Sequence, residues 1–361
     1  MTARTRPTSR PPLPVRAVVF VANTGLKAVR HRIQRLKVGW RNYRYRARNS
    51  WTGRTVWRLA AFAQAPRETR ARRRAAAAYT TRIRSAEMSA RDGFCLLEPA
   101  YFPDIHRVLT VCRELFERKL AAAAGADTSG VERDGQLKVR AAKREHLRNL
   151  LGSDDLREHP ELVDFALSEA ALGTAARYLG TIPYLNRVDL LYSVPRADDE
   201  KVSSQLFHVD PEGLSQVKFF INVYDVAETE GPFTFIPAAE TARIVREVTG
   251  LRRRAGKALS GRYLDDEVAA VGGAGAVVRV TGPRGSAVAV DTSRCLHLGS
   301  RVHPGAFRLC LYLQYCASRE RGNAFDVDRY RDDDVRTLAV RHSLASAGAD
   351  VSAPHQMDPA S

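Results

Sequence analysis

The sequence predicts a mainly β domain with flanking helices, preceded by a basic helical N-terminal arm. Helical apolar patterns occupy the first part of the domain. From around residue 184, short β-rich runs separated by turn residues dominate, as in a barrel or a sandwich. Charge sets the arm apart, because residues 1–90 hold 22 Lys and Arg against two acids, whereas residues 91–361 carry a net charge of −3. We therefore expect the arm at 1–90, the domain at 91–320 and a polar C-terminal tail at 321–361.

A basic amphipathic helix is predicted within the arm. Apolar residues from Leu26 to Ala47 recur at steps of three and four and so share one helix face, while Lys and Arg lie largely on the others. Such a helix can pack on the domain, lie on an anionic membrane surface or contact nucleic-acid phosphates. Residues 26–74 are thus the candidate surface for a membrane or another acidic partner, with nucleic acid as the alternative. The basic run Arg67–Arg74, followed by Ala75–Ala78, predicts an exposed helix.

The first part of the domain predicts one strand and three helices. Gly93–Leu97 reads as a strand, and Pro103–Ala123 places its apolar residues on one face of a helix. After a loop at 125–135, further helices are expected at Gln136–Leu151 and at Pro160–Leu179, the second ended by the glycine that follows it.

The second part of the domain predicts a series of strands, interrupted by a charged helical insertion at residues 239–271. The expected strands are Tyr184–Val194, Ser204–Val209, Val217–Tyr224, Phe233–Ile236, Ala276–Thr281, Ala287–Asp291 and Phe307–Tyr315.

The cysteines and the apolar runs predict a cytoplasmic protein, peripheral at a membrane if its arm binds one. The five cysteines form no Cys-x-x-Cys pair, which argues against a disulfide framework and against a cysteine-zinc site. No apolar run approaches the roughly 20 residues needed to cross a bilayer. Ala17–Ala22 is short for a signal peptide, and no clear small-residue cleavage site follows it.

Two histidines, an aspartate and an arginine form the candidate site. His208 and Asp210 lie two residues apart on an expected strand, so their side chains share one face. His297 follows another strand, and Arg308 comes eleven residues later inside an apolar run. Alone, each histidine also fits a structural role. Together, two imidazoles and a carboxylate can bind Fe(II) and leave three positions open for a 2-oxo acid and dioxygen. Arg308 can grip the far carboxylate of that acid, or pair with an internal acid instead.

These residues resemble the phytanoyl-CoA dioxygenase family of Fe(II)/2-oxoglutarate oxygenases over residues 91–318. The similar stretches are Ser204–Asp210, Val217–Val226, Glu230–Phe233, Phe235–Pro237 and Asp291–His297 with Arg308. The resemblance implies a double-stranded β-helix, which is a cupin-like jelly roll with helices packed on one side. The site is then expected between the two sheets, with the charged insertion at residues 239–271 as a lid over it. It also implies that iron is bound by His208, Asp210 and His297, and that Arg308 anchors 2-oxoglutarate.

The resemblance further implies the activity and three additional site residues. Many relatives carry a serine two residues after the distal histidine to hold the co-substrate. Here Gly299 takes that place, so Ser300 is the candidate. Lys218 and Gln205 are expected to line the pocket, or else to be polar sheet-edge residues. Asp210 argues for hydroxylation, because halogenating relatives lack this carboxylate.

The expected substrate is a small metabolite, or an acyl-linked, lipid-linked or phosphorylated compound. Three alternatives stay open. They are an oxygenase that acts on nucleic acid through the arm, a non-catalytic jelly-roll binding protein, and a zinc hydrolase, which would have no evident use for Arg308.

Overall fold

The computed structural model of this 361-residue chain describes residues 65–124, 146–196, 201, 203–210, 215–299, 301–320 and 322–341. The amphipathic helix expected in the arm and the loop expected at 125–135 lie outside the described residues. Within the described residues, no helix has both the length and the apolar character that a membrane crossing requires.

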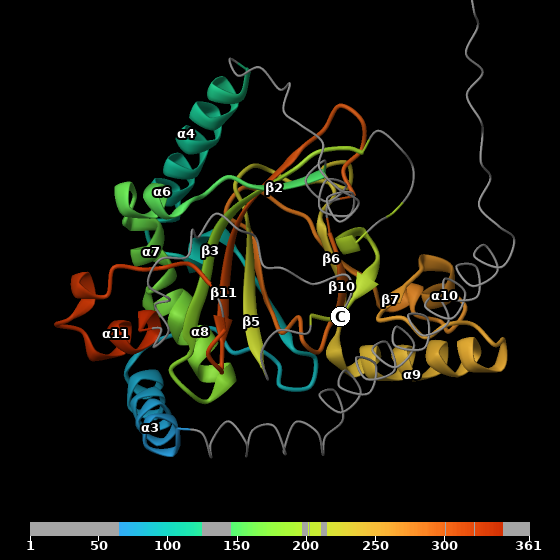
Figure 1. Ribbon diagram of the computed structural model, residues 1–361, viewed down its shortest axis with the longest axis horizontal. Helices are drawn as coiled ribbons and strands as arrows, with labels where there is room; N and C mark the ends of the chain where they lie inside the picture. The colour runs from blue at the N-terminus through green and yellow to red at the C-terminus, as the bar shows by residue number, and fades with distance from the viewer. Residues whose placement is uncertain are drawn as a thin grey trace, which may run out of the picture. The chain divides into compact units, whose positions relative to one another are not determined.

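The strands form two antiparallel sheets (Figure 1). The six-stranded sheet has the order β1-β9-β5-β11-β3-β2, and the five-stranded sheet has the order β7-β4-β10-β6-β8. Within them, β3-β11-β5-β9 and β4-β10-β6-β8 are the two halves of an eight-stranded jelly roll, so the predicted fold class is confirmed. The strands are β1 Phe94–Leu97, β2 Leu147–Asn149, β3 Tyr184–Ser193, β4 Phe207–His208, β5 Gln216–Asn222, β6 Phe233–Ile236, β7 Arg262–Tyr263, β8 Val278–Val280, β9 Ala287–Val290, β10 Leu296–Leu298 and β11 Arg308–Cys316.

Strand β11 lies inside the six-stranded sheet and separates two environments. Leu311 and Leu313 belong to the core that this sheet forms with the helices. Cys310 and Tyr312 point the other way and pack among side chains between the two sheets. The predicted division of this strand into two faces is therefore confirmed. Each buried leucine contributes about 1.5–3 kcal/mol, so the helix-facing side holds the strand in place while its other face carries polar residues.

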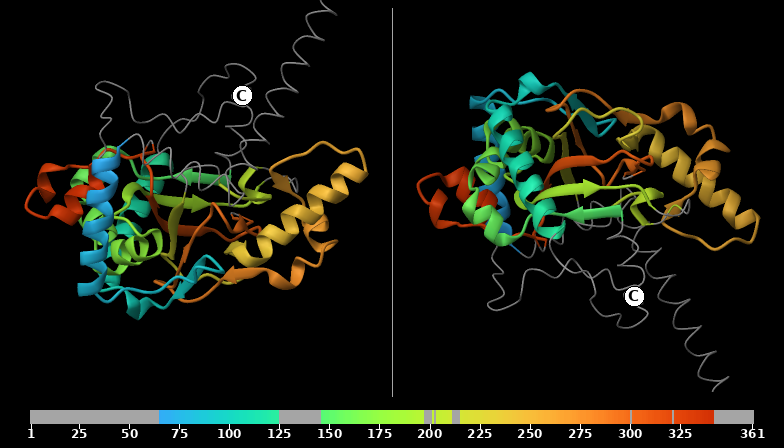
Figure 2. Two further views of the ribbon diagram at one scale, coloured as in Figure 1. Left: turned by 90° about the horizontal axis from the view of Figure 1, so that it is seen from below. Right: turned by 90° about the horizontal axis from the view of Figure 1, so that it is seen from above.

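Helices pack on the outer face of the six-stranded sheet (Figures 1 and 2). The strand and helix expected at Gly93–Leu97 and Pro103–Ala123 are confirmed as β1 and α4. The helix expected at Pro160–Leu179 divides into α7 and α8, because the Ser168 side chain accepts a hydrogen bond in the first turn of α8 and caps it. As predicted, α8 ends at Gly180, which has a φ of 64°. The helices on this side are α3 Pro66–Arg82, α4 Ile105–Ala124, α6 Ser153–Glu158, α7 Glu161–Ala166, α8 Glu169–Leu179 and α11 Asp334–Val340.

The helix expected at Gln136–Leu151 is wrong at its described end, where β2 pairs with the edge of β3. The Leu150 amide donates to the carbonyl of Leu190 over 2.9 Å, and the Asn149 side chain accepts from the Leu190 amide over 3.1 Å. The free edge of β3 needs partners for its backbone groups. This pairing between distant segments outweighs the local helical pattern.

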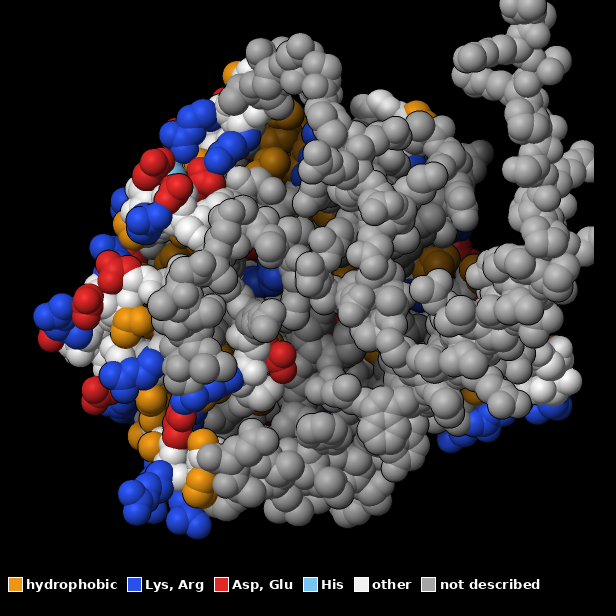
Figure 3. Space-filling model, in the orientation of Figure 1, with side chains coloured by type: hydrophobic (Ala, Val, Ile, Leu, Met, Phe, Trp, Pro, Cys, Tyr) orange, Lys and Arg blue, Asp and Glu red, His pale blue; other side chains and the backbone are white. Residues whose placement is uncertain are grey.

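The helix expected at Arg67–Arg74 is present as α3, but only part of its surface is exposed. Arg72 and Ala76 are each 3% exposed, and α3 contacts α8 and α11. Arg70 and Arg74 are exposed, and Figure 3 shows basic side chains where α3 lies. The expectation of an exposed helix is therefore wrong for the face that packs on the domain.

The tail expected to be polar also contains a packed helix. In α11, Ala339 and Val340 are almost completely buried, and the helix contacts β3 and α3. Local polarity in this Asp- and Arg-rich stretch concealed the short apolar end that docks on the sheet.

The insertion expected at residues 239–271 is mainly helical, as predicted, with α9 at Ala238–Arg254 and α10 at Asp265–Ala269. Between these helices, strand β7 pairs with β4 and extends the five-stranded sheet. The buried Arg252 guanidinium ties the insertion together, because it binds both carboxylate oxygens of Glu267 over 2.7 and 2.5 Å. The insertion therefore adds an edge strand next to a strand that carries part of the candidate site.

Candidate metal centre

Two histidines meet on neighbouring strands of the five-stranded sheet. His208 ends β4, His297 is the middle residue of β10, and the two are direct partners in the antiparallel register. Their ring centroids lie 4.3 Å apart. The strand expected at Ser204–Val209 shortens to β4, and β10 was not predicted at all. Strands of two and three residues are too short to show an alternating pattern in the sequence.

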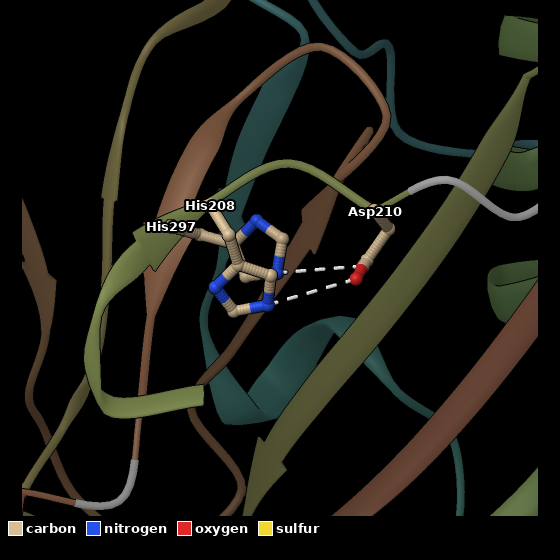
Figure 4. Close-up of side chains that lie close together, drawn as sticks. All are labelled: His208, Asp210 and His297. Carbon is tan, nitrogen blue, oxygen red and sulfur yellow. Dashed lines mark ion pairs between the residues drawn. The ribbon is translucent and has the colours of Figure 1, made fainter. Parts of the chain in front are cut away.

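Asp210 completes a three-residue cluster with the two imidazoles (Figure 4). Its Oδ1 lies 3.7 Å from Nε2 of His208, and its Oδ2 lies 3.4 Å from Nε2 of His297. One possible ligand atom from each residue lies within 4.8 Å of the others. The Asp210 amide donates to the carbonyl of Thr292 over 2.9 Å, so the turn before β10 holds the carboxylate beside the imidazoles. The structure thus brings together the three residues that the sequence assigned to one metal.

Backbone carbonyls orient both imidazoles toward this point. Nδ1 of His208 lies 2.8 Å from the carbonyl of Leu206, and Nδ1 of His297 lies 3.0 Å from that of Cys295. We therefore assign the proton to each Nδ1, which leaves the Nε2 lone pairs for a metal. Burial lowers the pKa of His208 well below its ordinary value, which keeps this ring in the neutral form that binds metals.

Asp210 supplies the negative charge of the cluster. Its side chain is 12% exposed, and the ammonium Nζ of Lys218 lies 2.6 Å from Oδ2. Burial alone would raise the pKa of Asp210. The nearby positive charges, chiefly the Lys218 ammonium, outweigh burial and hold the pKa of this carboxyl well below its ordinary value. An ionised carboxylate beside two imidazole nitrogens is a donor set that suits Fe(II). The residues present therefore fit the ion that the sequence suggested.

Arg308 begins β11 and is 4% exposed. Its Nη1 donates to the carbonyl of Gly231 over 2.9 Å, whereas its buried Nε has no hydrogen-bond partner among the described residues. Burial lowers the pKa of Arg308, and no carboxylate in the described part of the chain forms an ion pair with it. The internal acid considered from the sequence is thus not found among those residues. A buried arginine with unused donors is ready to bind an anion.

The Arg308 guanidinium lies beside Gly299, in the segment that follows the cluster residue His297. A Cβ at Gly299 would lie 3.6 Å from Nη2 of Arg308. Gly299 follows His297 by two residues, which span about 7 Å in an extended chain. The guanidinium therefore lies beside the segment that leads away from His297.

Gly231 is required where the loop before β6 crosses the segment after β10. It has a φ of 68°, and a Cβ there would meet the backbone of Arg301 at 2.6 Å. A side chain would push these two segments apart and displace the carbonyl that Arg308 binds.

Aromatic rings form one wall beside the cluster. The Phe233 and His297 ring centroids lie 5.6 Å apart, and Phe233 stacks on Phe220 with centroids 3.8 Å apart. Both phenylalanines are buried between the sheets. This wall excludes water from one side of the histidine pair.

Three further residues were predicted to line the site, namely Lys218, Gln205 and Ser300. Lys218 lies on the central strand β5 and binds Asp210, so it is not a sheet-edge residue. Gln205 is 6% exposed in the turn before β4, and its carbonyl accepts hydrogen bonds from Arg301 over 2.6 and 2.9 Å. Ser300 lies outside the described residues.

Sequence reasoning missed Arg301, which joins the candidate site to the insertion. Its guanidinium binds Gln205 through the backbone carbonyl and both carboxylate oxygens of Asp265 over 2.9 and 2.8 Å. No local pattern could have revealed a contact among three segments so far apart in the chain. The expected lid thus has a direct link to the segment that follows His297.

Comparisons with known proteins give only distant similarities. No family model matches the chain, and no curated protein matches it. Among solved structures it is similar to EctD from S. alaskensis with 2-oxoglutarate and 5-hydroxyectoine, at 15% identity and a TM-score of 0.40, covering 63% of this chain and 72% of that chain. It is also similar to SnoN, a non-heme alpha-ketoglutarate-dependent epimerase from nogalamycin biosynthesis, at 17% identity and 0.39, covering 79% and 96%. A third is AviO1 from Streptomyces viridochromogenes Tue57, at 18% identity and 0.38, covering 66% and 94%. At these values the fold assignment rests on the strand order alone.

Proposed function

We propose that the protein is an Fe(II)- and 2-oxoglutarate-dependent dioxygenase that hydroxylates a small-molecule substrate. One juxtaposition carries the proposal. The cluster consists of two imidazoles and a carboxylate. The buried, incompletely bonded guanidinium of Arg308 lies beside Gly299, which follows the cluster residue His297 by two positions. A metal-free binding protein has no need for the cluster, and a zinc hydrolase has no need for the guanidinium.

Each residue of the site has a separate task in this proposal. Nε2 of His208, Nε2 of His297 and one oxygen of Asp210 hold the iron and leave three positions open. Arg308 receives the far carboxylate of 2-oxoglutarate through its unused donors. When bound, Fe(II) and 2-oxoglutarate supply the oxidising chemistry by activating dioxygen.

The protein also shields the reaction from water. Phe233 and Phe220 are buried beside the histidine pair and keep water from that side. In a dry site the charges of Asp210, Lys218 and Arg308 act more strongly than they would in solvent. These residues bind and orient the reactants and do not themselves carry out the oxidation.

We propose that the substrate is a small metabolite, or an acyl-linked, lipid-linked or phosphorylated compound. The exposed arginines of α3, such as Arg70 and Arg74, support an acidic partner or an anionic membrane surface near the domain. An enzyme that acted on nucleic acid through the arm would instead bind DNA or RNA with a steep salt dependence.

The first prediction tests the metal site directly. Anaerobic addition of Fe(II) and 2-oxoglutarate should produce a weak visible absorption band, and aerobic incubation should form succinate in an iron-dependent way. His297→Ala should abolish both the band and succinate formation, because it removes one of the three metal donors and the two that remain bind iron too weakly. His303→Ala, at an exposed histidine outside the cluster, is the matched control and should behave like the unaltered protein. An unchanged band in His297→Ala would remove this residue from the metal site and end the proposal.

A further inference from the structure

Lys218 is an unusual residue for its place in the fold. It lies in the middle of β5, which is flanked in the sheet by β9 and β11, and every residue of β5 is buried. The backbone of Lys218 is paired on one side with Val290 and on the other with Gln314. Lysine is almost never found fully buried without a partner, because its ammonium loses its hydration. A specific role for the side chain must offset this cost.

The ammonium of Lys218 is directed at the metal cluster. Its Nζ lies 2.6 Å from Oδ2 of Asp210, and it also lies 5.5 Å from the centre of the Tyr312 ring. The side chains of the ion pair are only 9% and 12% exposed. Lys218 comes from the six-stranded sheet, whereas both histidines come from the five-stranded sheet. The ion pair therefore joins the two halves of the jelly roll at the candidate site.

We propose that Lys218 is a positioning residue of the metal centre, which holds one oxygen of Asp210 so that this carboxylate offers a single oxygen to the ion. The inference rests on the proposed function. That function needs three open coordination positions, two for the co-substrate and one for dioxygen. A carboxylate that bound the ion through both of its oxygens would occupy one of these three coordination positions. An ammonium on one oxygen prevents this mode of binding.

The same contact keeps the site assembled before metal binds. The carboxylate lies within 3.7 Å of one imidazole nitrogen and 3.4 Å of the other. The Lys218 ammonium pairs with the buried Asp210 carboxylate, so this charge is not left unpaired while it lies beside the imidazoles. Residues that orient metal ligands in this way typically contribute about 10- to 100-fold in metal affinity.

Removing Lys218 has two opposing effects on metal affinity. Loss of a positive charge near the ion would strengthen metal binding, whereas loss of orientation would weaken it. We expect orientation to dominate, because the carboxylate lies between the ammonium and the place where the three donors meet. Lys218→Met should therefore weaken binding of Mn(II), counted through the EPR signal of the free ion, by about 10- to 100-fold. Lys218→Arg, which keeps a cation at this position, should recover most of the loss.

The control comes from a second lysine–aspartate pair. Nζ of Lys201 also lies 2.6 Å from a carboxylate oxygen, that of Asp265, but this lysine is 47% exposed and lies outside the metal cluster. Lys201→Met should leave Mn(II) affinity unchanged. If Lys218→Met does not fold, Lys218→Gln, which keeps a hydrogen-bond donor without the charge, takes its place and should fall between the lysine and methionine proteins.

A double-mutant cycle distinguishes positioning from general damage. In an Asp210→Asn background the carboxylate is absent, so Lys218→Met should cause no further loss of Mn(II) affinity. The anaerobic Fe(II)/2-oxoglutarate band should shift or weaken in Lys218→Met alone. Unchanged or tighter Mn(II) binding in Lys218→Met, or an equal loss in both backgrounds, would overturn the inference and leave the proposed function standing. Absence of Mn(II) binding in the unaltered protein would instead refute the metal site and the proposed function.

Discussion

Two regions of the molecule bury an arginine to nearly the same extent but give its guanidinium very different numbers of hydrogen-bond partners. Arg72 lies where α3 meets the start of β3 and α11, and it is 3% exposed. Its three guanidinium nitrogens donate to the Glu68 carboxylate and to the carbonyls of Ile182 and Leu338, over 3.1, 3.0 and 2.7 Å. Its guanidinium also lies 3.6 Å from the centre of the Tyr184 ring. This arginine is bonded on every side and holds three elements together.

Arg308, at the start of β11, is 4% exposed. Among the described residues it donates to one backbone carbonyl, that of Gly231, and its buried Nε has no partner. Burial therefore does not distinguish a structural arginine from a ligand-binding one. The unused hydrogen-bonding capacity does, because a buried donor without a partner costs about 1–3 kcal/mol unless something binds it. The Arg72 guanidinium is used for folding, whereas in the proposed function the Arg308 guanidinium is available for the carboxylate of 2-oxoglutarate.

The largest expected effect comes from Arg308→Met. The variant should raise the 2-oxoglutarate concentration needed for half-maximal succinate formation by about 100-fold or more, equal to roughly 3 kcal/mol. Mn(II) affinity should change only a few-fold, because no metal donor is removed. The unfolding temperature should change little, since the substitution removes a buried Nε without a partner but also removes the donor to the Gly231 carbonyl. Equal losses of Mn(II) affinity and 2-oxoglutarate affinity would show that Arg308 is part of the general scaffold.

Arg72→Met should have the opposite profile. The substitution removes the Arg72 donors to a buried carbonyl, that of Ile182, and to a partly buried one, that of Leu338. It also removes one partner of Glu68, so we expect a loss of about 3 kcal/mol in the free energy of unfolding. Urea unfolding measures this loss, and the 2-oxoglutarate requirement of the folded fraction should not change. We propose on this basis that the folded domain begins at α3 and not at residue 91, where its start was expected from the sequence. A variant as stable as the unaltered protein would contradict that boundary.

The smallest expected effect is a pH dependence at the same junction. Burial alone would raise the pKa of Glu68, but hydrogen bonds from Arg319, Tyr184 and Arg72 outweigh it and lower the pKa to about 2 from an ordinary value of 4.5. Since the folded-state pKa is depressed, the contribution to stability is present above pH 4.5 and is lost as the pH falls toward 2.

Glu68→Gln tests this pH dependence through urea unfolding at several pH values. The variant should unfold more easily than the unaltered protein above pH 4.5, and the difference should shrink between pH 4.5 and 2. Glu87→Gln, at an exposed carboxylate, is the control and should follow the unaltered protein. A constant difference across this range would mean that the Glu68 charge contributes nothing to the junction.

Much of the β core could be predicted from the sequence because its strands are long enough to show alternation. Strand β11 has nine residues, and its alternating pattern alone predicts its apolar and polar faces correctly. The candidate ligands were also named, because His208 and Asp210 have the spacing of residues on one strand face and Arg308 stands out in an apolar run. In the structure β4 ends at His208, and Asp210 lies just beyond it. Alternation and residue chemistry are local properties, and a sequence displays them directly.

Only the tertiary structure decided how these pieces meet. It placed β10 beside β4, packed one face of α3 on the domain and turned the end of an expected helix into β2. It also paired Lys218 with Asp210 across two sheets and left Arg308 without a described counter-ion. Each of these outcomes depends on contacts between residues far apart in the chain. The free energy of such contacts comes from burial and from completed hydrogen bonds, which no local window of sequence contains.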